Sequence, residues 1–385
     1  MKNKFLILAL SFGLIFSLGA FGILKYNSTN KVTPKENFTA KVDNFNNIGE
    51  ACGKLTADIN ERPALKGCVG EYIKKAVEVK GFKATAADIE QSVQKFPEIN
   101  VVCHPYAHYL GAGAWKEYKS IRKSLNFATS FCAWGYLHGL NVAASEDLKG
   151  DALLKELLDG CAYIKELKGN PFECAHGIGD AFDVSGKYDL LYAFSFCRKI
   201  PDAGMHRNCS EGASNHWMDY YMVEGVLKGV YKPEGAAKLL FKGQPYAMCL
   251  QVPDRIDRNG CLDYATHLIP GYKEGLAALE KACYQLAGLD NDGCFKGLGR
   301  EYAFTPSVTL KDAVSRCLKA ENYMGVRMCA GDLINAKTQV YRDRNGSILK
   351  EACSYDISLR DERMVKACKS IADALKGYFN KDYQL

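Results

Sequence analysis

Sixteen cysteines at regular intervals constrain the fold of this chain of 385 residues more than any other feature. From residue 161 onward they form pairs with 10 to 14 residues between partners: Cys161/Cys174, Cys197/Cys209, Cys249/Cys261, Cys283/Cys294, Cys317/Cys329 and Cys353/Cys368. Corresponding members of successive pairs recur every 33 to 39 residues, with one longer step of 52 residues. A period of this size is typical of helical hairpins stacked side by side.

Helical periodicity favours an all-α body. Residues 151–167 place apolar side chains at intervals of three and four, as an amphipathic helix does. Glycine and proline, which break helices, lie between the two cysteines of several pairs, so each pair brackets a hairpin loop. We therefore predict αα-hairpins that are stapled by disulfides and stacked as a solenoid. Cys52/Cys68 fits this scheme, and Cys103 and Cys132 are paired by elimination only.

The N-terminal residues indicate export. Residues 5–24 are uncharged and apolar, with Lys2 and Lys4 before them and Lys25 after them. A helix of this length spans the ~30 Å core of a bilayer, so the segment is a transmembrane anchor or a signal peptide that is removed. In both cases the positive flank places the rest of the chain outside the cytoplasm, in the periplasm or the extracellular space. The membrane is a partner if the helix stays, and the protein is secreted if it is cleaved.

Composition divides the chain into five segments. Residues 1–25 are the anchor or signal peptide, and residues 26–45 form a polar linker without helical periodicity. Residues 46–229 form a helical-repeat half that contains the histidine cluster. Residues 230–246, rich in glycine and proline, are an insertion that lengthens one period, and residues 247–385 are the C-terminal helical repeats.

The stapled hairpins, with a period of about 34 to 36 residues, resemble the secreted cysteine-rich Sel1-like and tetratricopeptide-like repeat proteins. The resemblance covers the chain from Cys161 onward and rests on the spacing of the cysteines. It implies a scaffold that binds a partner, and it brings no catalytic residues with it.

The charge of the chain excludes one class of partner. The formal net charge of +6 comes from 50 basic and 44 acidic residues, without a block of like charge. Nucleic-acid-binding proteins gather basic residues into a patch or stripe. We therefore predict no nucleic-acid partner.

Alignment of the chain on the second cysteines exposes two further patterns. Glycine stands three residues after Cys132, Cys174, Cys209 and Cys294, which predicts close helix packing. The positions two and six residues after each of these cysteines are four residues apart, so they lie on one face of a helix. Including the hairpin of Cys261, they hold Trp134/His138, His176/Asp180, Glu211/Asn215, Asp263/His267 and Lys296/Arg300. If the helices stack, these pairs line up along the inner surface.

Four histidines in this pattern predict a metal site. His104, His108, His138 and His176 lie within 73 residues of one another, each in or just before one of these helices. Imidazoles from separate packed helices can converge on one zinc, copper or iron ion. Asp180 and Glu211 follow as a fifth ligand, an outer partner or a general base.

Two functions are consistent with this sequence, and it does not decide whether the protein is an enzyme. The first is an exported metalloprotein whose histidine site catalyses a hydrolytic or redox reaction. The second is a non-catalytic scaffold whose helical surface binds a peptide or protein of the cell envelope. In the second case the histidines only satisfy hydrogen bonds, and surface residues such as Lys296 and Arg300 contact the partner.

Overall fold

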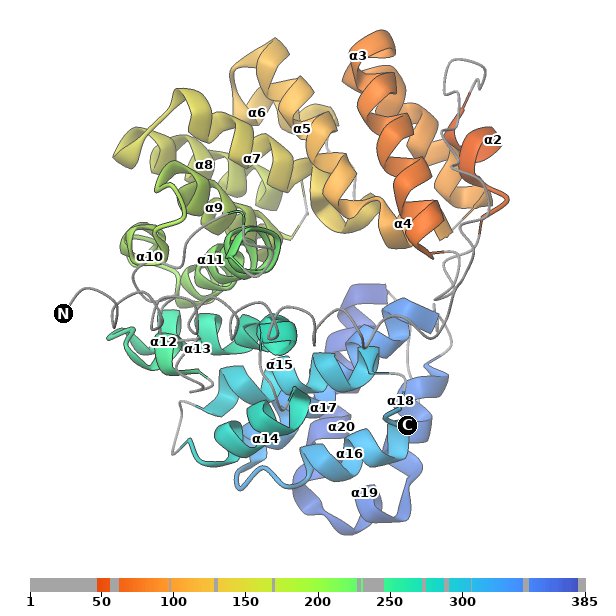
Figure 1. The fold of residues 1–385 in the computed structure, drawn as a ribbon, viewed down its shortest axis with the longest axis vertical. Coiled ribbons are helices and arrows are strands. Elements are labelled where there is room, and N and C mark those ends of the chain that lie inside the picture. The colour runs from red at the N-terminus through yellow and green to blue at the C-terminus, as the bar shows by residue number, and fades with distance from the viewer. Residues whose placement is uncertain are drawn as a thin grey trace, which may run out of the picture. The chain divides into compact units, whose positions relative to one another are not determined.

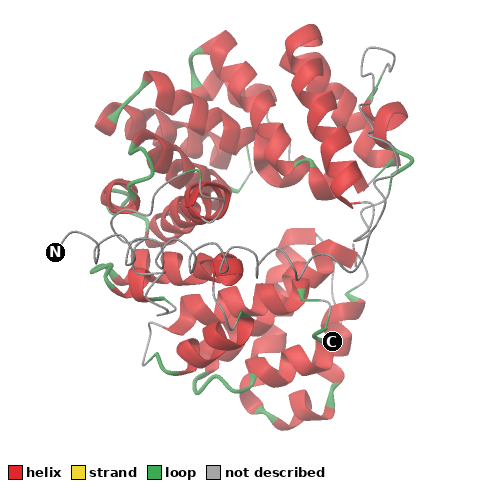
Figure 2. Cartoon of the chain, in the orientation of Figure 1, coloured by secondary structure: helices red, strands yellow, loops and turns green. Residues whose placement is uncertain are grey.

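Helices form all of the regular secondary structure in the described part of the computed structural model (Figure 2). The structure describes residues 47–55, 62–96, 98–127, 131–167, 170–226, 230, 246–271, 275–286, 291–305, 307–341 and 346–379. No strand occurs within these ranges. The prediction of an all-α body is therefore confirmed.

One set of helices, which we call the B helices, packs in the order of the chain (Figure 1). The B helices are α5 (His104–Tyr118), α7 (Gly135–Asp147), α9 (Pro171–Ser185), α11 (Ala203–His216), α13 (Arg255–Tyr264), α15 (Asn291–Phe304), α17 (Tyr323–Tyr341) and α20 (Glu362–Phe379). Each contacts the next, from α5 to α20. The contact between α11 and α13 continues this row across residues 230–246.

Another helix precedes most of the B helices and packs against the B helix that follows it. These preceding helices are α6 (Ile121–Ser124), α8 (Gly150–Glu166), α10 (Leu190–Cys197), α12 (Ala247–Leu250), α14 (Leu276–Tyr284), α16 (Leu310–Cys317) and α18 (Ser347–Ser354). The remaining elements are α2 (Ile48–Cys52), α3 (Arg62–Lys95), α4 (Glu98–Val102), η2 (Leu125–Phe127), η3 (Phe131–Trp134), the π-helix η4 (Trp217–Val226), η6 (Ala265–Gly271) and α19 (Asp356–Arg360). The hairpin that the cysteine spacing predicts thus recurs along the described chain.

Eight disulfides join all sixteen cysteines, with Cα–Cα distances of 5.2 to 6.0 Å. The six pairs from Cys161 onward, Cys52–Cys68 and Cys103–Cys132 are all bonded as predicted. Six of them connect one of these preceding helices to the B helix that follows it. A chain with every cysteine bridged is typical of an oxidising compartment.

Glycines set the distance between neighbouring B helices. A Cβ atom on Gly135 would lie 2.3 Å from the carbonyl oxygen of His104, and one on Gly212 would lie 1.9 Å from that of His176. A Cβ on Gly297 would lie 2.2 Å from the carbonyl oxygen of Asp263. These glycines stand three residues after a cysteine, so the predicted packing role is confirmed. The B helices therefore touch backbone to backbone beside the candidate site residues.

The predicted apolar segment 5–24 and the linker 26–45 lie outside the described residues, as does most of the insertion 230–246. Among the helices that the structure does describe, none combines the length and the apolarity needed to cross a membrane.

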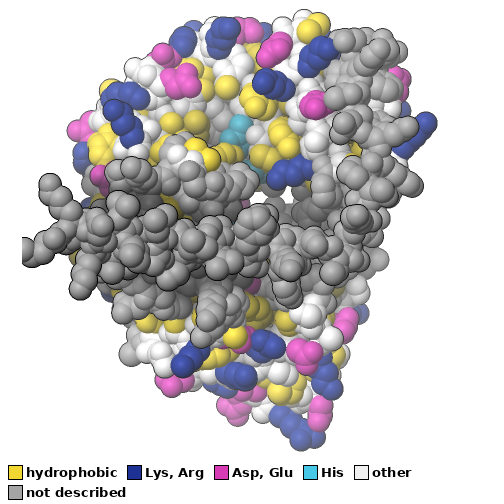
Figure 3. Space-filling view, viewed as in Figure 1, with side chains coloured by type: hydrophobic (Ala, Val, Ile, Leu, Met, Phe, Trp, Pro, Cys, Tyr) yellow, Lys and Arg dark blue, Asp and Glu magenta, His cyan; other side chains and the backbone are white. Residues whose placement is uncertain are grey.

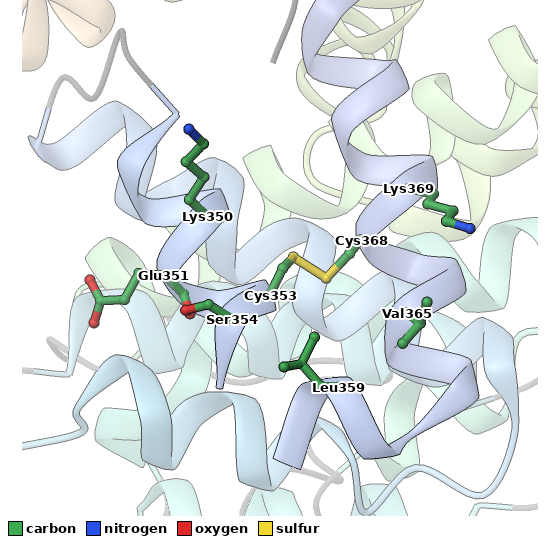
Figure 4. Close-up of a pocket in the computed structure, with 8 residues that line it drawn as sticks. All are labelled: Lys350, Glu351, Cys353, Ser354, Leu359, Val365, Cys368 and Lys369. Carbon is green, nitrogen blue, oxygen red and sulfur yellow. A yellow bond between two sulfur atoms is a disulfide. The ribbon is translucent and has the colours of Figure 1, made fainter. Parts of the chain in front are cut away.

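The last disulfide differs from the others in its exposure. Cys353 is the one half-buried cysteine, whereas the other fifteen are buried. With Leu359 and Val365, Cys353 and Cys368 line a cavity of about 540 Å³ between α18 and α20 (Figure 4). An external thiol must reach a sulfur atom before it can break a disulfide. This bridge is therefore the most accessible one.

We expect mild reduction of the native protein to open Cys353–Cys368 first. Brief treatment with a small thiol, followed by alkylation and peptide mapping, should label these two cysteines before any other pair. The buried bridge Cys161–Cys174, with both cysteines at 0% exposure, serves as the internal control. Equal labelling of the two bridges would contradict the expectation.

Candidate metal centre

Three of the predicted histidines meet where α5 packs on α7. Cys103 is the N-cap of α5, His104 is its first residue, and Pro105 favours helix initiation there. His108 lies one turn later on the same face. The ring centroids of His104 and His138 are 5.1 Å apart, and those of His108 and His138 are 6.0 Å apart. One ligand atom from each histidine lies within 4.8 Å of the other two.

Close packing of the two helices brings these rings together. A Cβ atom on Gly139 would lie 2.2 Å from the carbonyl oxygen of His108, so only glycine allows this approach of α7 to α5. Gly135 has the same relation to His104. Since His138 stands between these two glycines in the sequence, its side chain is held beside both histidines of α5.

Neighbouring oxygen atoms indicate which nitrogen of two rings presents its lone pair. His104 Nδ1 lies 3.0 Å from the carbonyl oxygen of Cys132, which can only accept, so Nδ1 donates and Nε2 has the lone pair. His138 Nδ1 lies 3.2 Å from Asp180 Oδ2. Metal-binding histidines commonly donate their second N–H to a carbonyl or a carboxylate in this way.

Several buried polar atoms in this cluster are unsatisfied. His108 Nε2, His138 Nε2 and Asp180 Oδ1 have no hydrogen-bond partner among the described residues. Buried polar atoms are otherwise almost always hydrogen-bonded, because an unsatisfied one loses its interaction with water. These atoms are therefore suited to bind an ion or a polar ligand.

Burial keeps the imidazoles neutral. Burial and the neighbouring His104 lower the pKa of His108 to about 3, and burial with the adjacent histidines lowers the pKa of His138 well below its ordinary value. Burial and the nearby Lys296 lower the pKa of His176 to about 3. A histidine must be neutral to bind a metal ion. All three side chains meet this condition at neutral pH.

His176 and Asp180 form a second group with His138. Ligand atoms of His138, His176 and Asp180 also lie within 4.8 Å of one another. The rings of His138 and His176 are nearly parallel, at 14° with centroids 5.1 Å apart. Burial raises the pKa of Asp180 to about 7, so this carboxyl group can gain or lose a proton near neutral pH. The four predicted histidines thus form two overlapping groups that share His138.

Glu211 lies in a different environment, a cluster of charged side chains. Its carboxylate is 2.8 Å from Lys296 Nζ and 3.2 Å from Arg207 Nε. Lys296 Nζ is also 2.8 Å from Asp263, whose second oxygen lies 2.6 Å from Arg300 Nη2. Glu211 belongs to neither histidine group. Its geometry is that of an ion-pair partner, whereas Asp180 contacts a candidate ligand directly.

The cluster also contains features that the sequence analysis missed. The side chains of Lys296 and Arg300 are only 19% and 16% exposed, so they are not the surface residues that the scaffold hypothesis requires. Asp332 lies 3.9 Å from Arg300 and was not singled out. It stands three residues after Cys329, at the position where four other hairpins have glycine, and this carboxylate in place of glycine was the available signal.

A third group, His206, Asp254 and Asp257, also has metal-ligand spacing. However, Asp257 already binds His206, Arg198 and Ser210, at 2.8, 2.6 and 2.6 Å. Asp254 accepts hydrogen bonds from two backbone amides as the N-cap of α13. Because these carboxylates are satisfied within the protein, the group has a structural role.

The histidine site reaches the molecular surface. His104 and His108 are half-buried, whereas His138 is only 4% exposed. Figure 3 shows histidine side chains on one face of the molecule, surrounded by hydrophobic side chains. A small molecule can therefore approach these histidines from solvent.

Comparisons with known proteins add no relative: no protein-family model, no curated protein and no solved structure matches this chain. The resemblance to Sel1-like and tetratricopeptide-like proteins stays a prediction. Any function must therefore be argued from the site itself.

Proposed function

We propose that the protein is an exported metalloprotein that binds one divalent transition-metal ion through His104, His108 and His138. The observation that carries this proposal is the group of three imidazoles with ligand atoms within 4.8 Å of one another. The unsatisfied Nε2 atoms of His108 and His138 support it. Nitrogens bound tetrahedrally to one ion at ~2.0–2.1 Å lie about 3.3 Å apart, so small side-chain movements would complete the site.

Asp180 has the role of an outer partner in this proposal. Its carboxylate lies 3.2 Å from His138 Nδ1, so a proton on Nδ1 would face Asp180 and leave Nε2 of the same ring for the ion. Such a carboxylate fixes the ring and increases the basicity of the ligand nitrogen. With its pKa raised to about 7, Asp180 is also suited to accept a proton from a substrate.

The ligand set suits zinc, copper or non-haem iron, which all bind imidazole well. Three protein ligands leave one coordination position for water or substrate, the arrangement found in catalytic zinc sites. A metal-dependent hydrolase or oxidoreductase is therefore the class of enzyme that we propose.

The setting of this site is part of the proposal. We infer that the B helices form a solenoid and that residues 5–24 tether it to the membrane, with the body outside the cytoplasm. The eight disulfides and the uncharged N-terminal segment support this location.

Metal analysis of the purified full-length protein tests the proposal. We expect about one equivalent of zinc, copper or iron in the wild type. Replacing Asp180 by asparagine should weaken metal affinity about 10–100-fold, and His138→Ala should weaken it further because it removes a ligand. Competition with a chromophoric chelator measures both effects.

Control variants separate the two histidine groups. His267→Gln changes a histidine that pairs with Asp219 outside both groups and should leave the metal content unchanged. His108→Ala should lose the ion while His176→Ala retains it, and the reverse result would place the ion in the second group. A wild type without stoichiometric metal, or unchanged metal in His138→Ala, would disprove the function.

A further inference from the structure

A cavity of about 310 Å³ lies among α9, α15, α17 and α20, and the proposed metal site does not use it. Its wall contains charged side chains of both signs and the apolar side chains Met328, Ile371 and Ala374. Ligand pockets in proteins occupy ~300–1,000 Å³. The cavity is thus large enough for a small molecule and too small for a folded partner.

One wall of the cavity presents a guanidinium. Arg327 Nε donates to Ser370 Oγ at 2.9 Å, and one terminal nitrogen faces the sulfur atoms of Met324 and Met328. No carboxylate in the described ranges forms an ion pair with Arg327. Lys296, the other cation of the wall, is already bound to Glu211 and Asp263. Arg327 is therefore the cation that can receive an anionic group of a ligand.

Two carboxylates that also face the cavity have no hydrogen bond to a cationic side chain in the described ranges. Glu173, in the first turn of α9, has neither a hydrogen bond nor an ion pair with the described residues. Asp332 is 3.9 Å from Arg300 Nη1, which exceeds hydrogen-bond distance. Burial raises the pKa of both groups, that of Asp332 to about 6. A cationic group would compensate these partly buried acids.

We propose that this cavity binds a small dipolar ligand of the free amino acid or dipeptide class. The ligand carboxylate pairs with Arg327, whose planar guanidinium matches a carboxylate through two parallel hydrogen bonds. The ligand ammonium group lies between Glu173 and Asp332, and the apolar wall contacts its side chain. This inference does not rest on the metal centre.

Calorimetric titration of the full-length protein with the twenty common amino acids and with glycylglycine tests the proposal. At least one of these probes should bind. Its N-acetyl derivative, which lacks the ammonium group, and its amide, which lacks the carboxylate, should each bind at least ~10-fold more weakly, because each loses one charge-assisted contact. Absence of binding by every probe, or equal binding of the blocked derivatives, would overturn the proposal.

Variants locate the bound probe. Arg327→Met and Glu173→Gln should each reduce affinity ~10-fold or more, whereas Arg360→Gln, at an exposed ion pair, should not. Gly331→Leu offers a variant that keeps every charge: Gly331 lines the cavity, and its added Cβ would meet only Ile371, at 3.8 Å. The larger side chain should fill the cavity and abolish binding while the thermal midpoint without ligand stays unchanged. Undiminished binding in the folded Gly331→Leu variant would place the ligand elsewhere.

Discussion

Replacing Asp263 by alanine should lower the free energy of unfolding by about 3–5 kcal/mol, because it leaves buried cations without their main partner. Lys296 and Arg300 both contact this carboxylate, at 2.8 and 2.6 Å, and the Asp263 side chain is only 1% exposed. Glu211 and Asp332 remain nearby, but each contacts only one of the two cations. Urea unfolding with the disulfides intact measures the loss.

The matched control is a carboxylate in an exposed ion pair. Asp151 contacts Lys199 at 2.6 Å, and the two side chains are 80% and 46% exposed. Asp151→Ala should therefore cost less than about 1 kcal/mol. If the two variants lose similar stability, the buried cluster does not stabilise the fold in the way that its geometry indicates.

The pKa of Asp263 predicts how the free energy of unfolding changes with pH. Burial alone would raise the pKa of Asp263, but Arg300 and Lys296 outweigh burial and lower it below the ordinary value. The contribution of Asp263 to folding stability is therefore present above the ordinary aspartate pKa of ~3.9. It is lost as the pH falls through the lower pKa of the folded state. Asp263→Ala should show a smaller loss of stability on acidification than the wild type.

Gly212→Ala should be the most damaging single methyl addition in the described helices. The new Cβ would lie 1.9 Å from the carbonyl oxygen of His176, and a backbone atom cannot move aside as the end of a flexible side chain can. Overpacking typically costs ~1–3 kcal/mol, and we expect a cost at or above the upper end because α9 and α11 must separate. The thermal midpoint and the urea midpoint should both fall.

Gly67→Ala is the control for this variant. Gly67 is also helical, but nothing lies within 4 Å of its added Cβ. Alanine there should leave stability unchanged or increase it by about 0.4–1 kcal/mol, since it restricts the unfolded chain. Equal destabilisation by both changes would show that helical glycine as such, rather than interhelical contact, determines the cost.

The repeated hairpin was predictable because its signals are local. A cysteine at each end of a loop and a glycine three residues later recur in the sequence. In the structure the two cysteines form a disulfide, and the glycine lies in close contact with a neighbouring helix. Trp134 shows where this reasoning failed. The spacing predicts one helical face for Trp134 and His138, but the φ of 65° puts Trp134 before α7, in a conformation that a right-handed helix excludes.

The candidate site was only partly predictable, because its details depend on neighbours from other hairpins. The spacing of the histidines placed His104, His108, His138 and His176 near one another, and they do adjoin. Their division into two groups depends on ring orientation, which the sequence does not encode locally. The burial of Lys296 depends on Glu211 and Asp263, which come from two other helices.

The bridge between Cys103 and Cys132 has a consequence for how the proposed metal site would assemble. Cys103 directly precedes His104, and Cys132 lies just before the helix that carries His138. Oxidation of this one pair thus ties two ligand-bearing segments together without help from an ion. In zinc fingers, by contrast, the metal itself must order the chain. Here the disulfide alone would hold the two segments together, so a reducing environment would weaken metal binding even though no cysteine is a ligand.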